Sequence, residues 1–305
     1  MAVAEAYAQL VSVLKGTVLA NERMQRHTSY RIGGPAALYI TCDTLADIRV
    51  ATEVLACEGV PWVIMGRGTN VLVSDEGYGG AVLTLGNEFK RFAVDENANL
   101  HVGAALLLQR AISEAFNRGL SGLEFAVGIP GTVGGAISMN AGTATHWIGS
   151  IVDEVITYRP GEGIKRYAGE DICWYYRCCD IPMSEIILET SLKLGVANEA
   201  RVKDAMESAL AYRKSKQPLE ALSCGSVFRN PENCKAAELI ESCGLKGYTC
   251  GQAQVSPKHA NFIVNLGDAT ANDVANVIVH VMDEVRRRYG TELRPEVKFL
   301  GFASS

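Results

Sequence analysis

The chain has 305 residues, is 48% hydrophobic and contains 30 glycines, so it is long enough to bury large cores and predicts about two domains. Its formal net charge of −5, without a long run of either sign, argues against a nucleic-acid-binding protein, which would normally carry a basic face. No apolar run reaches the roughly 20 residues that span a bilayer, and the start of the chain does not resemble a signal peptide, so we expect no membrane insertion.

Helices and short strands alternate among the predicted elements up to about residue 195. Capping-box patterns at Thr44 and Asp47, and again at Thr270 and Asp273, each predict the start of a helix. The segment 225–231 is expected to be a loop or a short strand. In chain order, the predicted strands are 60–66, 71–75, 81–85, 152–159, 186–194 and 261–265, and the predicted helices are 44–59, 104–118, 199–216, 235–243 and 270–289.

The nine cysteines are expected to be reduced thiols. Their number is odd, and no Cys-x-x-Cys occurs. The closest group, Cys173, Cys178 and Cys179, lacks the second pair of ligands that a zinc site would need. We therefore expect no metal site and a cytoplasmic location.

Two glycine-rich loops, residues 66–70 (GRGTN) and 128–142 (GIPGTVGGAISMNAG), predict a cofactor site because bare backbone N–H groups can approach phosphate oxygens closely. Val71 stands where the third glycine of a Rossmann fingerprint would be, and no P-loop motif occurs. The second loop is apolar and uncharged, which suits a flavin dinucleotide; the alternative is a structural loop between two sheets. The expected cofactor-binding residues are Gly66, Arg67, Gly68, Thr69, Asn70, Gly128, Ile129, Pro130, Gly131, Gly134, Gly135, Ser138, Asn140 and Gly142.

Motifs spread over residues 21–301 resemble the UDP-N-acetylenolpyruvoylglucosamine reductase family. They are HTSYRIGGPA, GRGTNVLVSD, LEFAVGIPGTVGGAISMNAG, YYR, GSVFRNP, SPKHANFIVN and LRPEVKFLG, in this order. The resemblance implies an α+β fold: an N-terminal helix in 1–20, a two-part FAD-binding domain of the vanillyl-alcohol oxidase (PCMH) type in 21–197, and a smaller substrate domain in 198–303.

The resemblance also implies the reaction. Non-covalently bound FAD would take a hydride from NADPH and reduce the enolpyruvyl ether of a UDP-sugar to UDP-N-acetylmuramate, for peptidoglycan synthesis. No separate nicotinamide-binding fingerprint and no obligate protein partner are evident in the sequence.

Three residues match the family's catalytic positions. Arg177 would stabilise the negative charge that develops on the substrate, Ser226 would donate the proton, and Glu296 would assist the enolate. Each has an ordinary alternative. Arg177 resembles a surface ion-pair residue, Ser226 a turn residue, and Glu296 a charge at a strand edge.

Further residues are expected to contact the substrate: Tyr176, Arg213, Lys214, Asn230 and His259. Arg213 and Lys214 also suit the basic end of a helix, and His259 suits a hydrogen-bonded structural role. Cys179 stands where the family often has serine, and the short interval between Arg177 and Ser226 implies the subclass without a substrate-covering tyrosine loop.

Two other functions remain open from the sequence. An oxidase of the same fold often attaches its flavin through His or Cys, but neither glycine loop contains a histidine. A non-catalytic flavin or UDP-sugar sensor would have no chemical need for Ser226.

Overall fold

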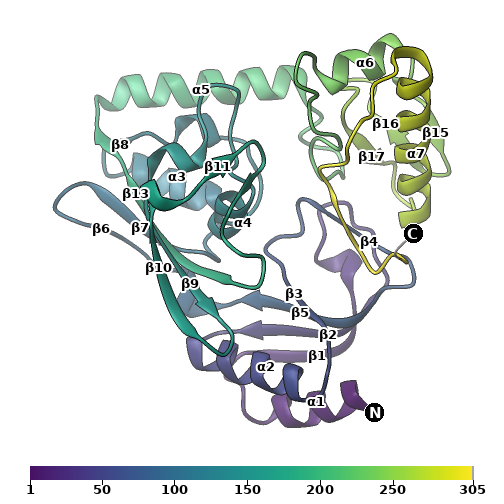
Figure 1. The fold of residues 1–305 in the computed structure, drawn as a ribbon. Coiled ribbons are helices and arrows are strands. Elements are labelled where there is room, and N and C mark those ends of the chain that lie inside the picture. The colour runs from purple at the N-terminus through teal and green to yellow at the C-terminus, as the bar shows by residue number, and fades with distance from the viewer. Residues whose placement is uncertain (304–305) are drawn as a thin grey trace. The chain divides into compact units, whose positions relative to one another are not determined.

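The computed structural model, which describes residues 1–303, has an α+β fold (Figure 1). The helices are α1 (Ala2–Val11), α2 (Leu45–Cys57), α3 (Leu108–Phe116), α4 (Val133–Ser138), α5 (Glu199–Lys216), α6 (Ala236–Ser242) and α7 (Ala271–Tyr289). The strands are β1 (Thr17–Arg23), β2 (Pro35–Cys42), β3 (Trp62–Ile64), β4 (Val71–Val73), β5 (Tyr78–Leu85), β6 (Phe92–Val94), β7 (Asn99–Gly103), β8 (Leu120–Ser121), β9 (Val152–Arg159), β10 (Gly163–Ala168), β11 (Trp174–Tyr175), β12 (Cys178–Cys179), β13 (Ile186–Lys193), β14 (Gly195–Val196), β15 (Thr249–Cys250), β16 (Ala253–Val255), β17 (Ile263–Asn265) and β18 (Lys298–Leu300).

Contacts between residues divide the chain into two compact units that are discontinuous in sequence. Unit 1 contains Met1–Ala20, Leu38–Gly66 and Gly80–Tyr212, and unit 2 contains Asn21–Ala37, Arg67–Gly79 and residues 213–303. The expected domain boundary at 197/198 stays a prediction. The N-terminal helix is shorter than the expected range 1–20, because α1 ends at Val11 and strand β1 begins at Thr17.

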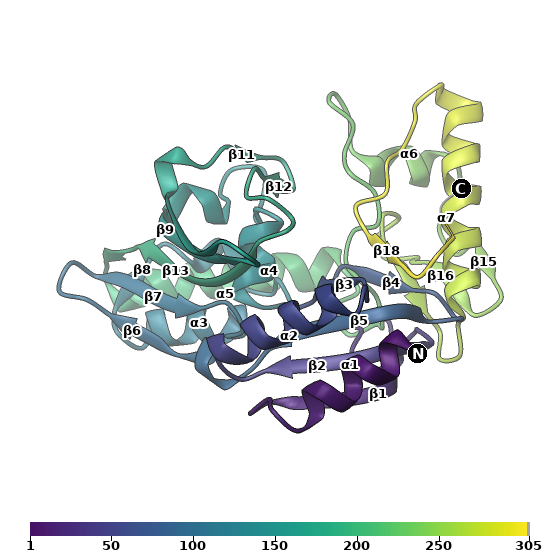
Figure 2. The ribbon, with the colours of Figure 1, turned by 60° about the horizontal axis from the view of Figure 1, so that its bottom comes forward.

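The first sheet of unit 1 has the strand order β1-β2-β5-β3, and α1 and α2 pack against it (Figure 2). The predicted capping box is confirmed: Thr44 and Asp47 each accept a hydrogen bond from the other's backbone N–H at the start of α2. The Asp47 carboxylate also accepts from the N–H groups of Lys15 and Gly16. One buried carboxylate therefore fixes both the start of α2 and the turn before β1.

The second sheet of unit 1 is antiparallel, with the order β10-β9-β13-β7-β6. Its core contains side chains from β7, β9 and β13 together with α3 and α4. Helix α4 lies within the second glycine loop. This loop is therefore part of the core of unit 1 and is held in a defined conformation.

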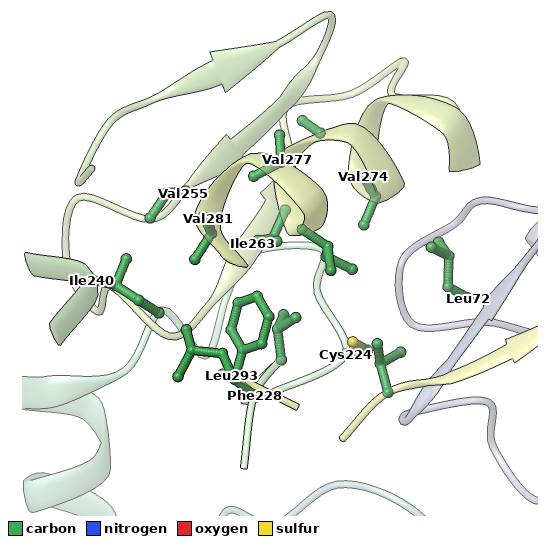
Figure 3. Close-up of a cluster of buried hydrophobic side chains, with 14 of the residues drawn as sticks. Leu72, Cys224, Phe228, Ile240, Val255, Ile263, Val274, Val277, Val281 and Leu293 are labelled. Atoms are coloured by element: carbon green, nitrogen blue, oxygen red, sulfur yellow. The ribbon is translucent and has the colours of Figure 1, made fainter. Parts of the chain in front are cut away.

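Unit 2 is built around α7, α6 and the sheet β15-β16-β17. Figure 3 shows Val274, Val277 and Val281 of α7 facing Phe228 and Ile263 in one buried cluster. The capping box predicted for this helix, at Thr270, is confirmed. Strand β18 pairs in parallel with β4, so residues from the first third of the chain belong to this unit.

Helix α5 has the predicted bounds and packs against unit 1 along one narrow stripe. Val202 is its one buried residue, and only Met206 and Leu210 add partly buried contacts to the same stripe. No helix in residues 1–303 is long and apolar enough to cross a membrane.

Candidate active site

Each glycine of the first glycine loop is confined by atoms of its own unit, Gly66 in unit 1 and Gly68 in unit 2. A Cβ on Gly66 would lie 2.6 Å from Oγ1 of Thr132, within unit 1, so the second glycine loop reaches this residue. Gly68, in unit 2, has φ +60°, and a Cβ there would lie 2.3 Å from the carbonyl oxygen of His27. Both positions therefore require glycine because neighbouring protein atoms leave no room for a side chain.

The N–H groups of this loop provide the observation that fits an anionic ligand. Within residues 1–303, those of Arg67, Gly68 and Thr69 donate no hydrogen bond to the protein, whereas the Gly68 carbonyl accepts from Ser29. Successive N–H groups without a protein acceptor form the kind of concavity that binds phosphate oxygens. The loop thus fits the pyrophosphate of FAD.

The second glycine loop differs from the expectation in one respect. Its apolar residues Val133 and Ile137 are fully buried in the core of unit 1, so they do not face a flat ligand. The first N–H groups of α4 are also engaged, because Val133 donates to Leu106 and Gly134 donates to Ala104. The helix N-terminus is therefore occupied by protein carbonyls.

Other residues of this loop lie in different environments. Gly128 and Gly131 have φ of 81° and 122°, and these left-handed positions suit glycine. Gly135 and Ser138 are exposed, so they stay candidates for contact with a cofactor. Asn140, by contrast, is buried, and its amide hydrogen-bonds to two backbone groups of the protein, from Tyr175 and Gly149.

Arg177 lies in the two-residue turn of the hairpin formed by β11 and β12. Its φ is 63°, and its Nη1 donates to the carbonyl of Gly142 at 3.2 Å, which joins it to the end of the second glycine loop. The guanidinium also lies over the ring of Tyr176, 5.2 Å from the ring centre. Cys179, opposite Trp174 on the hairpin, is half-buried, and this burial raises the pKa of its thiol.

The segments that carry Ser226 and Glu296 pair with each other in unit 2, although they are far apart in sequence. Phe228 and Pro295 pair as an antiparallel bridge, and the N–H of Glu296 donates to the carbonyl of Val227 at 2.7 Å. The residue next to Ser226 is thus directly opposite Glu296. Both site residues are partly exposed, whereas Val227 is buried.

Asn70 connects the first glycine loop to this pair within unit 2. Its side-chain amide donates to the carbonyl of Glu296 at 3.2 Å, and its own carbonyl accepts from the N–H of Lys298. At least one function of this predicted cofactor residue is therefore to hold the backbone of Glu296.

Asn261 was not identified from the sequence as a site residue. It is 4% exposed, its Oδ1 accepts from the N–H of Phe228 at 2.9 Å, and its Nδ2 donates to the carbonyl of Phe228 at 2.8 Å. Its carbonyl also accepts from the N–H of Val227, and Ser226 pairs with Phe262. Asn261 thus fixes the backbone that carries Ser226. The only sequence signal is a polar residue at the start of the predicted strand 261–265.

The predicted substrate-contacting residues of unit 2 have structural contacts as well. Asn230 accepts a hydrogen bond from the N–H of Ala236, where α6 begins. Nδ1 of His259 accepts from the N–H of Asn261, and burial lowers the pKa of the imidazole, which favours the neutral ring. The carbonyl of Lys214, near the end of α5, accepts from the ammonium of Lys258.

Arg213 belongs to the same last turn of α5 as Lys214. Basic side chains there are favoured by the helix dipole, so the alternative predicted from the sequence stays open for both residues. Within residues 1–303, no cluster of His, Cys, Asp or Glu is arranged to hold a metal ion.

Comparisons with known proteins identify the family. Residues 36–159 match the model of an FAD binding domain, and residues 217–300 match that of the UDP-N-acetylenolpyruvoylglucosamine reductase C-terminal domain. The reductase of Syntrophotalea carbinolica is 38% identical, with 97% of this chain and 98% of that protein covered. Reductase 2 of Symbiobacterium thermophilum is 41% identical, with 94% and 93% covered.

Among solved structures, that of the reductase from Thermus caldophilus matches with a TM-score of 0.81 and 33% identity, covering 94% of this chain and 99% of that chain. A similarity of this extent includes both matched domains. The chain therefore belongs to the UDP-N-acetylenolpyruvoylglucosamine reductase family and is an FAD-dependent oxidoreductase.

Proposed function

We propose that this protein uses NADPH to reduce the enolpyruvyl ether of UDP-N-acetylglucosamine to UDP-N-acetylmuramate, in the cytoplasm, as a step of peptidoglycan precursor synthesis. The observation that supports this most is the pairing of the segments of Ser226 and Glu296 through the hydrogen bond from Glu296 to Val227. A hydroxyl and a carboxyl on neighbouring backbones suit a proton transfer to a carbanion. The names of the relatives support the choice of substrate.

The reaction assigns a separate chemical task to each residue. FAD, when bound, supplies the hydride that reaches the terminal vinyl carbon of the substrate. The electron pair of the double bond moves toward the substrate carboxylate, where the guanidinium of Arg177 stabilises the negative charge. Ser226 donates its hydroxyl proton to the carbon that carries the ether oxygen, and Glu296 assists the enolate as a protonated acid.

The first glycine loop contributes its backbone to the cofactor site in this proposal. The unengaged N–H groups of Arg67, Gly68 and Thr69 support a contact with the pyrophosphate. NADPH is the proposed hydride donor. The sequence shows no Rossmann fingerprint for it.

Two variants test the assignments by separating flavin reduction from flavin reoxidation. Ser226→Ala should leave reduction by NADPH unchanged and slow reoxidation by the enolpyruvyl UDP-sugar by roughly 100- to 10,000-fold. Glu296→Gln should impair reoxidation more than reduction. The matched control is Ser242→Ala, an exposed serine on α6. Reoxidation of Ser226→Ala at the control rate would exclude Ser226 as the proton donor.

A further inference from the structure

We infer that Asn140 is a positioning residue for Arg177, and that it is not a ligand of the cofactor as its place in the glycine loop suggests. This inference rests on the proposed function, because it concerns the guanidinium that stabilises the charge on the substrate. All the contacts that carry it lie within unit 1.

Both ends of the Asn140 amide are engaged by the protein. Nδ2 donates to the carbonyl of Tyr175 at 2.9 Å, and Oδ1 accepts from the N–H of Gly149 at 3.0 Å. The residue is 6% exposed and has φ 40°, a left-handed conformation that asparagine adopts more readily than most residues. A buried amide whose two ends both bond to backbone groups connects these segments structurally.

The connection reaches Arg177 over a short distance along the chain. Tyr175 is the last residue of β11, and the hairpin turn contains only residues 176–177. The Arg177 guanidinium is held separately, by its hydrogen bond to the carbonyl of Gly142, two residues after Asn140. The segment 140–142 therefore fixes both the backbone before the turn and the side chain within it.

Trp174 and Gly149 complete the same connection. A Cβ on Gly149 would lie 2.3 Å from the Trp174 ring, so the indole packs directly on the glycine backbone. The indole N–H donates to the carbonyl of Gly169 at 3.0 Å, which fixes the ring. Gly149 therefore contacts the hairpin through Trp174 and donates its N–H to Asn140. The segments of Asn140, Gly149 and Trp174 together hold the backbone next to the turn.

Rigidity at this turn has a chemical consequence. A guanidinium stabilises a developing charge only when its planar donors already point to where the charge appears, since reorientation during the reaction would cost free energy. Loss of the Asn140 hydrogen bonds should therefore slow the step that needs Arg177, which is flavin reoxidation by substrate, and leave the binding of FAD and its reduction by NADPH intact.

The first test is Asn140→Gly, which removes both hydrogen bonds and tolerates the left-handed backbone. The matched control is Asn21→Gly, at an exposed asparagine with φ 52°. We expect FAD affinity, measured by fluorescence on the apoprotein, and reduction by NADPH to equal those of the control. We expect reoxidation by the enolpyruvyl UDP-sugar to be slower by roughly 100-fold, the order expected for a misplaced catalytic group.

A second test changes Gly149, the residue that accommodates the Trp174 ring. Gly149→Ala would push a methyl group into the Trp174 ring, whereas Gly195→Ala, with nothing within 4 Å, is its control. We expect the same selective loss of reoxidation in Gly149→Ala. If the glycine variant of Asn140 does not fold, Asn140→Asp, which keeps the acceptor for Gly149, should show the selective loss in its place.

Two outcomes would overturn the inference. One is a loss of FAD affinity in Asn140→Gly with normal reoxidation of the remaining holoenzyme, which would make Asn140 a cofactor ligand. The other is control-like behaviour in both half-reactions. A wild-type protein that this substrate does not reoxidise would contradict the proposed function instead, so the two failures are distinguishable in one experiment.

Discussion

Replacing Asn261 with alanine should destabilise the protein through two buried backbone groups. The N–H and carbonyl of Phe228, a residue 2% exposed, would both lose their partner. A buried polar group without a partner costs about 1–3 kcal/mol, so the two together cost about 2–6 kcal/mol. Because water can enter the space that the amide leaves, we expect a loss of stability in the lower part of this range, about 2–4 kcal/mol.

Thermal unfolding of the FAD-loaded protein measures this effect. At about 2–4 °C for each kcal/mol, Asn261→Ala should lower the midpoint by at least about 4 °C. The matched control, Asn272→Ala, changes an exposed side chain on α7 and should alter the free energy of unfolding by no more than about 0.5 kcal/mol. Equal midpoints for the two variants would refute the assignment of Asn261 as the support of the Ser226 segment.

Three further outcomes follow from single side chains. Tyr30 is fully buried, and within residues 1–303 its hydroxyl has only the buried thiol of Cys224 as a weak partner, so Tyr30→Phe should change the free energy of unfolding by no more than about 1 kcal/mol; a larger loss in urea unfolding would contradict this. Burial raises the pKa of Cys224 to about 12, so mass spectrometry should find it unmodified by a thiol reagent that labels exposed Cys57; equal labelling would contradict its burial. Hydrogen bonds from Asn99 lower the pKa of Asp95 to about 2. The contribution of Asp95 to stability is therefore present above its ordinary pKa of 3.8 and is lost as the pH falls toward 2. Asn99→Ala should raise the pKa of Asp95 in an NMR titration, and an unchanged pKa would contradict Asn99 as the cause.

Local signals in the sequence located the helices well. Each capping box combines a hydroxyl and a carboxylate three residues apart, and the structure shows both Thr44 with Asp47 and Thr270 with Asp273 in that arrangement. Such contacts form within one turn, so a single stretch of sequence contains all the information that specifies them.

Contacts between distant segments could not be predicted in the same way. The hydrogen bond from Asn70 to Glu296 spans 226 residues, and that from Asn265 to Tyr30 spans 235. These contacts place residues 67–79 and 21–37 in unit 2, where composition alone gave no indication of them. Strand pairing involves distant segments, and the local pattern of one strand does not identify the strand with which it pairs.

The glycine loops show the limit of motif analysis at a site. Their glycines stay predicted cofactor residues, but Val133 and Ile137 belong to the core of unit 1. Their spacing of four residues is that of one face of α4, and an apolar helix face looks the same in sequence whether it meets a ligand or a core. Asn140 was singled out for the same loop, and its hydrogen bonds to Tyr175 and Gly149 support the positioning role that we propose.

The central claim is the transfer of a hydride from NADPH to the enolpyruvyl UDP-sugar through bound FAD. An anaerobic absorbance spectrum of the purified protein, recorded before NADPH, after NADPH and after the UDP-sugar, tests it most directly. We predict a yellow protein that bleaches with NADPH and regains its colour when the UDP-sugar is added without oxygen. A bleached protein that regains its colour only when oxygen is admitted would contradict the proposed substrate.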